Sequence, residues 1–123
     1  MMHKMGLHKE YVQAIKGGSK QIEIRLCDSK RKQIRRGDRI RFQSTASDKE
    51  QLDVTVTSLQ VFKDFKSLYE AIPFKKMGCE GWSMEDMLEE TYAIYSSEQE
   101  QLYGVLAIGI RYEGQDDRLE KIE

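Results

Sequence analysis

Residues 18–25 of the chain read GSKQIEIR, and the fold of the surrounding sequence follows from this stretch. Apolar and polar residues alternate from Ile22 onward, so that Glu23 and Arg25 share one face and the isoleucines share the other. This two-residue period predicts a half-buried β-strand with a charged face. The preceding Gly17-Gly18 pair is a typical end for a short helix, which the apolar spacing predicts over residues 11–15.

The ionisable groups of this stretch are Lys20, Glu23 and Arg25, and two interpretations of them are open. Three such groups beside a glycine turn can hold an anion or a polar base while they remain paired with one another. The same spacing also fits a surface strand with an ordinary network of ion pairs, each worth at most about 1 kcal/mol. On spacing alone, the second interpretation is favoured.

The rest of the chain alternates short strands and short helices without a regular βαβ repeat. Asp64 and Ser83 are suited to cap helices, Pro73 is suited to end one, and a bulge is predicted near Ser58. The pattern predicts an α+β fold, with a small, mixed and strongly curved β-barrel flanked by short helices. Further strands are predicted over residues 3–7, 39–43, 52–61 and 103–112, and further helices over residues 65–72 and 84–95.

The chain has 123 residues, of which 39% are apolar and 33% are charged. This length fits one domain, and this composition excludes intrinsic disorder and low-complexity sequence. We expect a single domain over residues 1–112 and a charged C-terminal tail over residues 113–123. We expect neither a membrane helix nor a signal peptide. Two cysteines are too few for a disulfide framework, so we expect a cytoplasmic protein.

The net charge of −1 conceals an uneven distribution of charge along the chain. Residues 16–41 hold ten lysines and arginines against three acidic residues, which gives +7. Residues 80–123 hold twelve acidic residues against three basic ones, which gives −9. Any contact with a nucleic acid is therefore expected on one positive face, with the acidic side turned away.

The chain lacks the GxGxxG, P-loop, GxSxG and HExxH motifs of common nucleotide-binding and hydrolytic sites. A metal site would have to combine His3, His8, Cys27 and Cys79, whose positions show no ligand spacing. We therefore expect no metal and no cofactor, and we interpret the cysteines as small buried apolar residues.

The spacing of Gly18, Lys20, Glu23 and Arg25 resembles the GxKxxExR motif of the ASCH domain, a relative of the PUA RNA-binding fold. The resemblance extends over residues 3–112, because a strand and a helix precede the motif and an apolar strand closes the chain. It implies a PUA-like β-barrel with the motif in a cleft that binds RNA or a nucleoside-like small molecule. Lys20 would meet a phosphate or a carbonyl oxygen, and Glu23 would meet a base edge or a water. Arg25 would position Glu23 or stack.

One branch of small ASCH proteins is similar to an amidohydrolase that removes the acetyl group of N4-acetylcytidine. The resemblance implies a catalytic set of the motif lysine, a threonine and a downstream glutamate. Lys20 matches the lysine, Glu23 occupies the place of the threonine, and the downstream glutamate corresponds to Glu80. Because Glu23 has no hydroxyl, an enzyme of this kind would need Glu23 or Glu80 to activate water, with Lys20 stabilising an oxyanion.

Two further features of the sequence each have two interpretations. Arg35, Arg36 and Arg39 belong to a basic run that either contacts a phosphate backbone or is a solvated loop neutralised by the acidic third of the chain. Trp82 lies in a loop with two glycines and is either the wall or lid of a cleft or a core anchor.

The sequence thus leads to three hypotheses of function. The first is binding of RNA or a modified nucleoside by Lys20, Glu23, Arg25, Trp82 and the basic run. The second is an amidohydrolase acting on N4-acylated cytidine or a similar amide. The third is a protein-interaction adaptor that uses the acidic C-terminal helix and tail. The sequence leaves the oligomeric state open.

Overall fold

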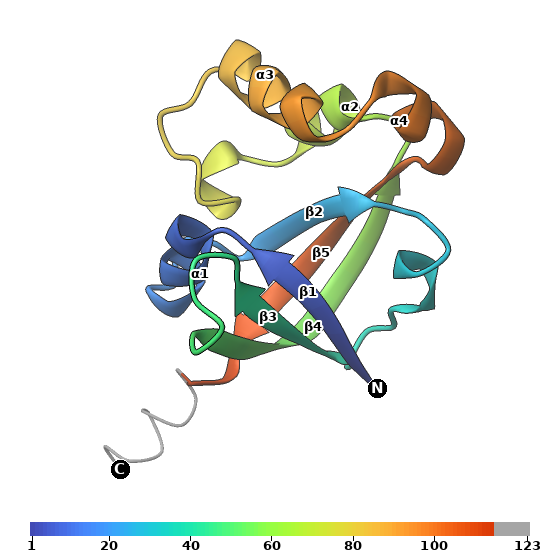
Figure 1. Cartoon of the computed structure of the whole chain (residues 1–123). Helices are drawn as coiled ribbons and strands as arrows, with labels where there is room; N and C mark the ends of the chain where they lie inside the picture. Colours follow the sequence, from blue (N-terminus) through green and yellow to red (C-terminus); the bar gives the residue numbers. More distant parts are fainter. Residues whose placement is uncertain (115–123) are drawn as a thin grey trace.

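A computed structural model of the chain describes residues 1–114, so most of the predicted tail (residues 115–123) lies outside the described residues. The α+β fold predicted from the sequence is confirmed (Figure 1). The strands are β1 (Met2–Leu7), β2 (Ile22–Leu26), β3 (Arg39–Ser44), β4 (Gln51–Phe62) and β5 (Val105–Tyr112). The helices are α1 (Lys9–Lys16), α2 (Phe65–Ala71), α3 (Met84–Ile94) and α4 (Ser97–Tyr103), with 3-10 turns at Arg31–Gln33 and Phe74–Lys76.

The five strands form one sheet in the order β1-β3-β4-β5-β2. The β1–β3 pair is parallel and the other pairs are antiparallel. The sheet curls into a half-barrel whose two edge strands, β1 and β2, are not paired with each other (Figure 1). The predicted bulge in the long strand is confirmed, because the register of β4 against β5 shifts between Val56 and Ser58. The strand that carries the motif is therefore a free edge.

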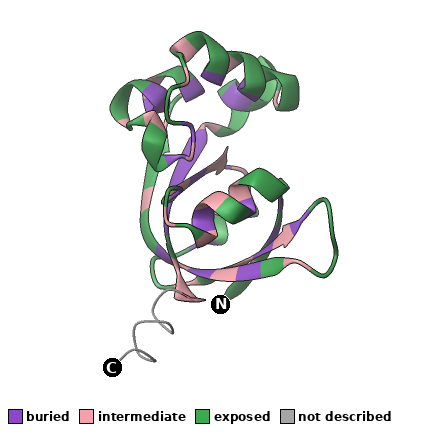
Figure 2. Ribbon diagram, turned by 90° about the vertical axis from the view of Figure 1, so that its left-hand side faces the viewer, coloured by how far each residue is buried: buried purple, intermediate pink, exposed green. Residues whose placement is uncertain are grey.

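The first core lies inside the curled sheet. Its side chains come from β1, β3, β4 and β5, and Ile40, Phe42 and Val54 are fully buried there. Helix α1 lies across the open end of the curl (Figure 2) and inserts Val12 and Ile15 into the same core. The short amphipathic helix before the motif thus serves as a plug for the half-barrel.

A second core lies between the helices α2 and α3 and the neighbouring strands β2 and β5. Leu26 and Val105 pack there against Phe65, Leu68 and Met87. Strand β5 is buried on both faces from Val105 to Ile110, because the first core covers one face and the helical layer covers the other. The predicted caps are confirmed, since the side chains of Asp64 and Ser83 accept hydrogen bonds from the backbone at the starts of α2 and α3.

Helix α4 was not predicted, because its sequence SEQEQLY lacks an apolar period and we expected a strand from residue 103 onward. The sequence feature that indicates this helix is a capping box. The side chain of Ser96 accepts a hydrogen bond from the Gln99 amide, and the side chain of Gln99 accepts one from the Ser96 amide. Glu100 on this helix is buried, and its carboxylate accepts hydrogen bonds from the Phe65 amide at 2.8 Å and the Tyr92 hydroxyl at 2.9 Å. These contacts tie α4 to the start of α2 and to α3.

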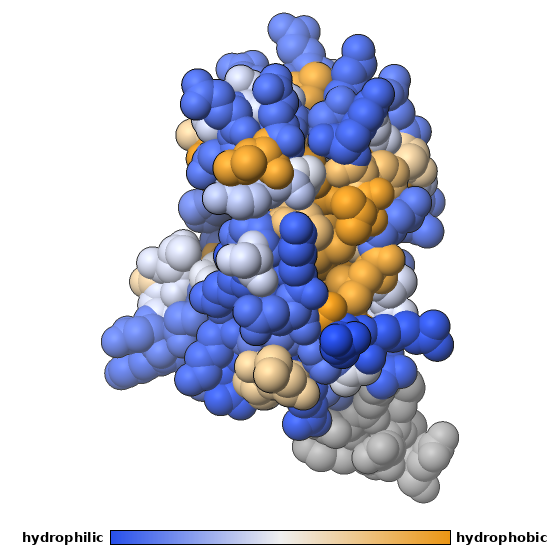
Figure 3. Space-filling view, turned by 90° about the vertical axis from the view of Figure 1, so that its right-hand side faces the viewer, coloured by the Kyte–Doolittle hydropathy of each residue, from blue (hydrophilic) through white to orange (hydrophobic). Residues whose placement is uncertain are grey.

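Some apolar side chains remain on the surface of the described part of the chain. Val61 and Leu102 are 64% and 73% exposed, and Ile94 is also exposed. Figure 3 shows apolar side chains gathered between the helical layer and the barrel on one face, with hydrophilic surface around them. No helix among residues 1–114 has the length and apolar character needed to cross a bilayer.

The carboxylate of Asp38 holds the turn before β3 to β1, and this contact predicts an acid-sensitive contribution to stability. Asp38 is hydrogen-bonded to His3 Nε2 at 2.8 Å and accepts from the Arg35 amide at 3.0 Å. These two bonds lower the pKa of Asp38 to about 2, against about 3.9 in an unfolded chain. Its stabilising contribution is therefore complete above about pH 4 and is lost as the pH falls toward 2.

We expect the urea midpoint of Asp38→Asn to decrease less than that of wild type between about pH 4 and 2. Only part is expected to be lost, because Glu23, Asp53 and Asp64 also have lowered pKa values. Asp48→Asn, which changes an exposed carboxylate, is the control. Parallel pH profiles for wild type and Asp38→Asn would contradict the assignment.

Candidate functional site

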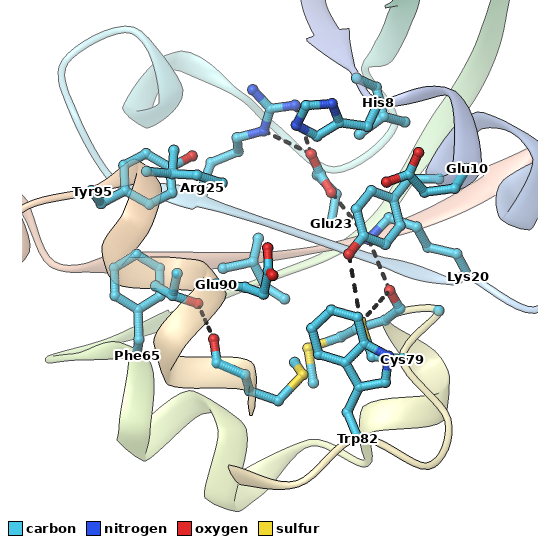
Figure 4. Close-up of a pocket in the computed structure, with 18 of the residues that line it drawn as sticks. His8, Glu10, Lys20, Glu23, Arg25, Phe65, Cys79, Trp82, Glu90 and Tyr95 are labelled. Atoms are coloured by element: carbon cyan, nitrogen blue, oxygen red, sulfur yellow. Dashed lines mark hydrogen bonds and ion pairs between the residues drawn. The ribbon is translucent and has the colours of Figure 1, made fainter. Parts of the chain in front are cut away.

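A cleft of about 700 Å³ lies between the half-barrel and the helical layer (Figure 4). It opens along the free edge of β2, where the end of β1 and the start of α1 face the loop over residues 77–82 and helix α3. Its polar lining residues include His8, Glu10, Lys20, Glu23, Arg25, Thr45, Glu90 and Thr91, and its aromatic ones are Tyr11, Phe65, Tyr69, Trp82 and Tyr95.

The structure brings Lys20, Glu23 and Arg25 together in one buried network. Lys20 Nζ lies 3.1 Å from Glu23 Oε1, and Arg25 Nε donates to Glu23 Oε2 at 2.7 Å. Lys20 and Glu23 are only 6% and 5% exposed. Figure 4 shows Glu23 between the two cations, with Trp82 across the cleft from it. The charged face of β2 is therefore buried at the cleft rather than solvated, while Ile22, Ile24 and Leu26 pack toward the helical layer.

The ammonium group of Lys20 already has a full set of partners. Besides Glu23, it donates to the carbonyl oxygens of Ile22 at 2.9 Å and Met77 at 3.2 Å. An ammonium group has three donors, so these three acceptors occupy all of them. Lys20 therefore fixes Glu23 and the loop at Met77. To bind a phosphate or an oxyanion directly, as the sequence suggested, it would have to give up one of these partners.

Arg25 closes the gap between the two edge strands of the half-barrel. While Nε is bonded to Glu23, Nη2 donates to the carbonyl oxygen of Gly6 in β1 at 2.6 Å. A side chain thus connects β2 to β1 at a position where no backbone ladder joins them. The predicted role of Arg25 in positioning Glu23 agrees with this geometry.

Glu23 carries a negative charge at neutral pH in spite of its burial. Burial by itself raises the pKa of a carboxyl group, but the positive charges of Lys20 and Arg25 and their hydrogen bonds outweigh it, and the pKa of Glu23 lies below its ordinary value. Each of its oxygens faces one cation and keeps lone pairs for a further donor. Glu23 can therefore accept a hydrogen bond from a ligand in the cleft.

Aromatic rings form much of the remaining wall. Phe65 is stacked with Tyr95 at 5.5 Å between ring centroids and with Tyr69 at 6.3 Å. The Tyr11 ring lies 5.0 Å from Lys20 Nζ. Trp82 is partly buried, lines the cleft and also packs against the second core.

The cleft contains a thiol but no activated one. Burial raises the pKa of Cys79, so the group is a protonated thiol at neutral pH, and it lies 3.9 Å from the Tyr11 hydroxyl. Burial also raises the pKa of Tyr11. Within residues 1–114, no three His, Cys, Asp or Glu side chains are grouped so as to hold a metal ion.

The lining charges of the cleft do not favour an anion. Two cations, Lys20 and Arg25, stand against the three carboxylates Glu10, Glu23 and Glu90. Both cations are already committed to Glu23, whereas Glu10 and Glu90 belong to exposed residues at the margin. A ligand that offers hydrogen-bond donors fits this lining better than a phosphate does.

The structure places four of the predicted site residues outside the cleft. Glu80 is exposed and does not line it, and the lining glutamates apart from Glu23 are Glu10 and Glu90. Arg39 forms two hydrogen bonds with the carboxylate of Glu113, at 2.9 and 3.0 Å. Arg35 and Arg36 are exposed and line no part of the cleft.

Sequence analysis missed other lining residues because they come from distant segments. His8, Glu10 and Tyr11 lie at the start of α1, while Glu90 and Thr91 lie on α3. The feature of the sequence that could have pointed to this part of the cleft was the loop over residues 78–82, which contains two glycines. Gly78 in that loop has a φ of +79°, and a side chain built there would lie 3.4 Å from the Cβ of Lys20. This close approach lets the loop pass directly over the motif.

Comparison with known proteins agrees with the fold and the motif. The sequence matches the ASCH domain over residues 5–113. The chain is 38% identical to the hypothetical protein PH0355, with a TM-score of 0.82, and the match covers 91% of this chain and 99% of that one. It is 35% identical to protein PF0455 from Pyrococcus furiosus, with a TM-score of 0.73 and coverage of 91% and 97%.

A more distant likeness concerns the fold alone. The crystal structure of a mutant ASCH protein from Zymomonas mobilis is 17% identical and superposes with a TM-score of 0.61, over 89% of this chain and 67% of that one. No curated protein matches the sequence.

Proposed function

Because the chain belongs to the ASCH domain family and has its PUA-like fold, we propose that it binds RNA or a modified nucleoside through a base inserted in the cleft. The family is associated with RNA binding. The observation that carries the proposal is the combination, in one cleft, of aromatic walls with a buried and charged Lys20–Glu23–Arg25 network. A nucleobase is a flat ring with a polar edge, and this cleft offers a surface for each.

The size and the aromatic walls of the cleft suit a single base. A volume of about 700 Å³ falls in the range of small-molecule sites, which is about 300–1,000 Å³. Trp82 and Tyr95 are partly buried, so each keeps surface that a flat ring can cover. Stacking of a base on an aromatic ring contributes about 1–3 kcal/mol.

The carboxylates determine which base edges are expected to bind. Glu23 has free lone pairs and a fixed position, and Glu10 and Glu90 add further acceptors. Carboxylates accept hydrogen bonds from exocyclic amino groups such as the N4 amine of cytosine. We therefore expect bases with an amino group, or with a substituted amino group that retains an N–H, to bind more tightly than uracil.

Binding is favoured over hydrolysis by three observations. The donors of Lys20 are occupied, Glu80 does not line the cleft, and Cys79 is a protonated thiol. The adaptor hypothesis rests on the charge of the acidic C-terminal helix and tail alone, and residues 115–123 of that tail lie outside the described residues. The amidohydrolase and adaptor hypotheses therefore gain no support from a contact in the cleft.

The chain's single tryptophan, Trp82, reports directly on the proposed cleft. We expect its fluorescence to change in a saturable way on titration with cytidine, N4-acetylcytidine or adenosine, and more weakly with uridine. A flat response to all four nucleosides and to a short single-stranded RNA would contradict the proposal.

Trp82→Ala is expected to weaken binding of the best of these ligands roughly 5- to 100-fold in calorimetry, because a stacking surface is lost. Tyr103→Ala, which removes an exposed aromatic side chain outside the cleft, is the matched control and should bind as wild type does. Equal affinities of Trp82→Ala and wild type would show that the base does not bind at this wall.

A further inference from the structure

A second hollow, of about 320 Å³, is lined by Lys20 and Gln21 of the motif region and by Lys76. The backbone of Lys76 and Met77 pairs with that of the motif. The Gln21 amide donates to the Lys76 carbonyl at 2.7 Å, and the backbones of Lys20 and Met77 form an isolated antiparallel β-bridge. Met77 lines the cleft and Lys76 lines the second hollow, whereas Lys20 lines both. Two hollows are therefore separated by one stretch of chain.

The bulge in β4 brings two hydroxyl groups to the same spot in this hollow. Consecutive residues of a regular strand point to opposite faces, but the register of β4 shifts between Val56 and Ser58. A Cβ atom placed on Gly109 would clash with Ser58 Oγ and would lie 2.7 Å from Thr57 Oγ1. Gly109 thus leaves room for both hydroxyls, and neither has a hydrogen-bond partner among the described residues.

The charge in the second hollow is opposite in character to that of the cleft. Lys76 and Arg111 line it together with Lys20, and no carboxylate does so among residues 1–114. Lys76 Nζ makes no ion pair within that part of the chain. The ammonium group of Lys76 and two hydroxyl donors around a small polar hollow suit a tetrahedral oxyanion, whose oxygens accept several hydrogen bonds at once.

We propose that this second hollow binds a phosphate group, held by Lys76, Thr57 and Ser58. The phosphate would belong to an RNA strand whose base occupies the cleft, and this part of the inference rests on the proposed function. A phosphate site outside the cleft would allow the protein to bind RNA even though the carboxylates of the cleft disfavour a phosphate and Lys20 has no free donor. The arginines of the basic run are not required for it.

The anion site can be tested without any nucleoside, by titrating the full chain with inorganic phosphate at constant ionic strength. We expect the largest amide chemical-shift changes in NMR spectra at Thr57, Ser58 and Gly109. Lys76→Gln should abolish these changes, whereas Lys75→Gln, which removes an exposed lysine of the same 3-10 turn outside the hollow, should retain them. Changes that are equal in both variants, or absent in wild type, would overturn the site.

The source of the phosphate is tested with a nucleoside, its 5′-monophosphate and a short single-stranded RNA. We expect Lys76→Gln to bind the nucleoside like wild type, to bind RNA roughly 5- to 10-fold more weakly, and to lower the slope of log affinity against log salt by about 1. If Lys76→Gln also weakens binding of the 5′-monophosphate, the phosphate belongs to the same nucleotide as the base. If it weakens binding of RNA alone, the phosphate belongs to a neighbouring nucleotide. Unchanged RNA affinity overturns the inference, whereas failure of the nucleoside to bind contradicts only the proposed function.

Discussion

Glu23→Gln is expected to reduce the free energy of unfolding by about 3 kcal/mol. The substitution preserves the volume of the side chain but removes the charge that compensates Lys20, whose side chain is only 5% exposed. The ammonium group would then keep two carbonyl acceptors and lose its counter-charge. A buried cation without a counter-charge is far more costly than a surface charge that loses its partner.

The measurement is urea unfolding at neutral pH, with Asp53→Asn as the matched control. Asp53 forms a two-bond ion pair with Arg41, at 2.8 and 2.9 Å, but both side chains are considerably exposed. Removal of that surface pair is expected to cost less than about 1 kcal/mol. Similar losses in the two variants would mean that the network around Glu23 is solvated in solution.

Phe65→Ala is expected to cost about 3–5 kcal/mol. Phe65 is fully buried and contacts three tyrosine rings, stacked on Tyr69 and Tyr95 and edge-on to Tyr92. Its removal leaves a cavity beneath the cleft wall that these rings cannot fill without leaving their other contacts. Because the wall is weakened, nucleoside affinity should fall together with stability.

Leu102→Ala is the control for this prediction, because Leu102 is 73% exposed and its change should stay within about 0.5 kcal/mol. Phe65→Leu should lie between the two, since it retains most of the apolar volume. If Phe65→Ala and Leu102→Ala unfolded at the same urea midpoint, the packing of α2 against α3 described above would be wrong.

The fold was largely predictable because its elements carry local signals. The alternation after Ile22, the caps at Asp64 and Ser83, and the bulge near Ser58 are each encoded within a few residues. Helix α4 escaped prediction because its sequence lacks an apolar period and its packing depends on distant partners. Its Glu100 is buried only because Phe65 and Tyr92 supply donors from two other helices.

Only those residues of the candidate site that are close together in the sequence were predictable. Lys20, Glu23 and Arg25 are neighbours in sequence, and the structure keeps them together. Glu10 and Glu90 reach the cleft through tertiary packing, for which no local pattern exists. The basic run was adjacent to the motif in sequence, but the turn before β3 and the pairing of Arg39 with Glu113 direct it elsewhere.

The gap between β1 and β2 has a consequence for the behaviour of the protein at high concentration. Each of these strands exposes one row of backbone donors and acceptors, and such edges template pairing with strands of other molecules. Here the guanidinium of Arg25 spans the gap, and an incoming strand would have to displace it from both Gly6 and the buried carboxylate of Glu23. The residue that shapes the cleft therefore also protects the sheet from edge-to-edge aggregation.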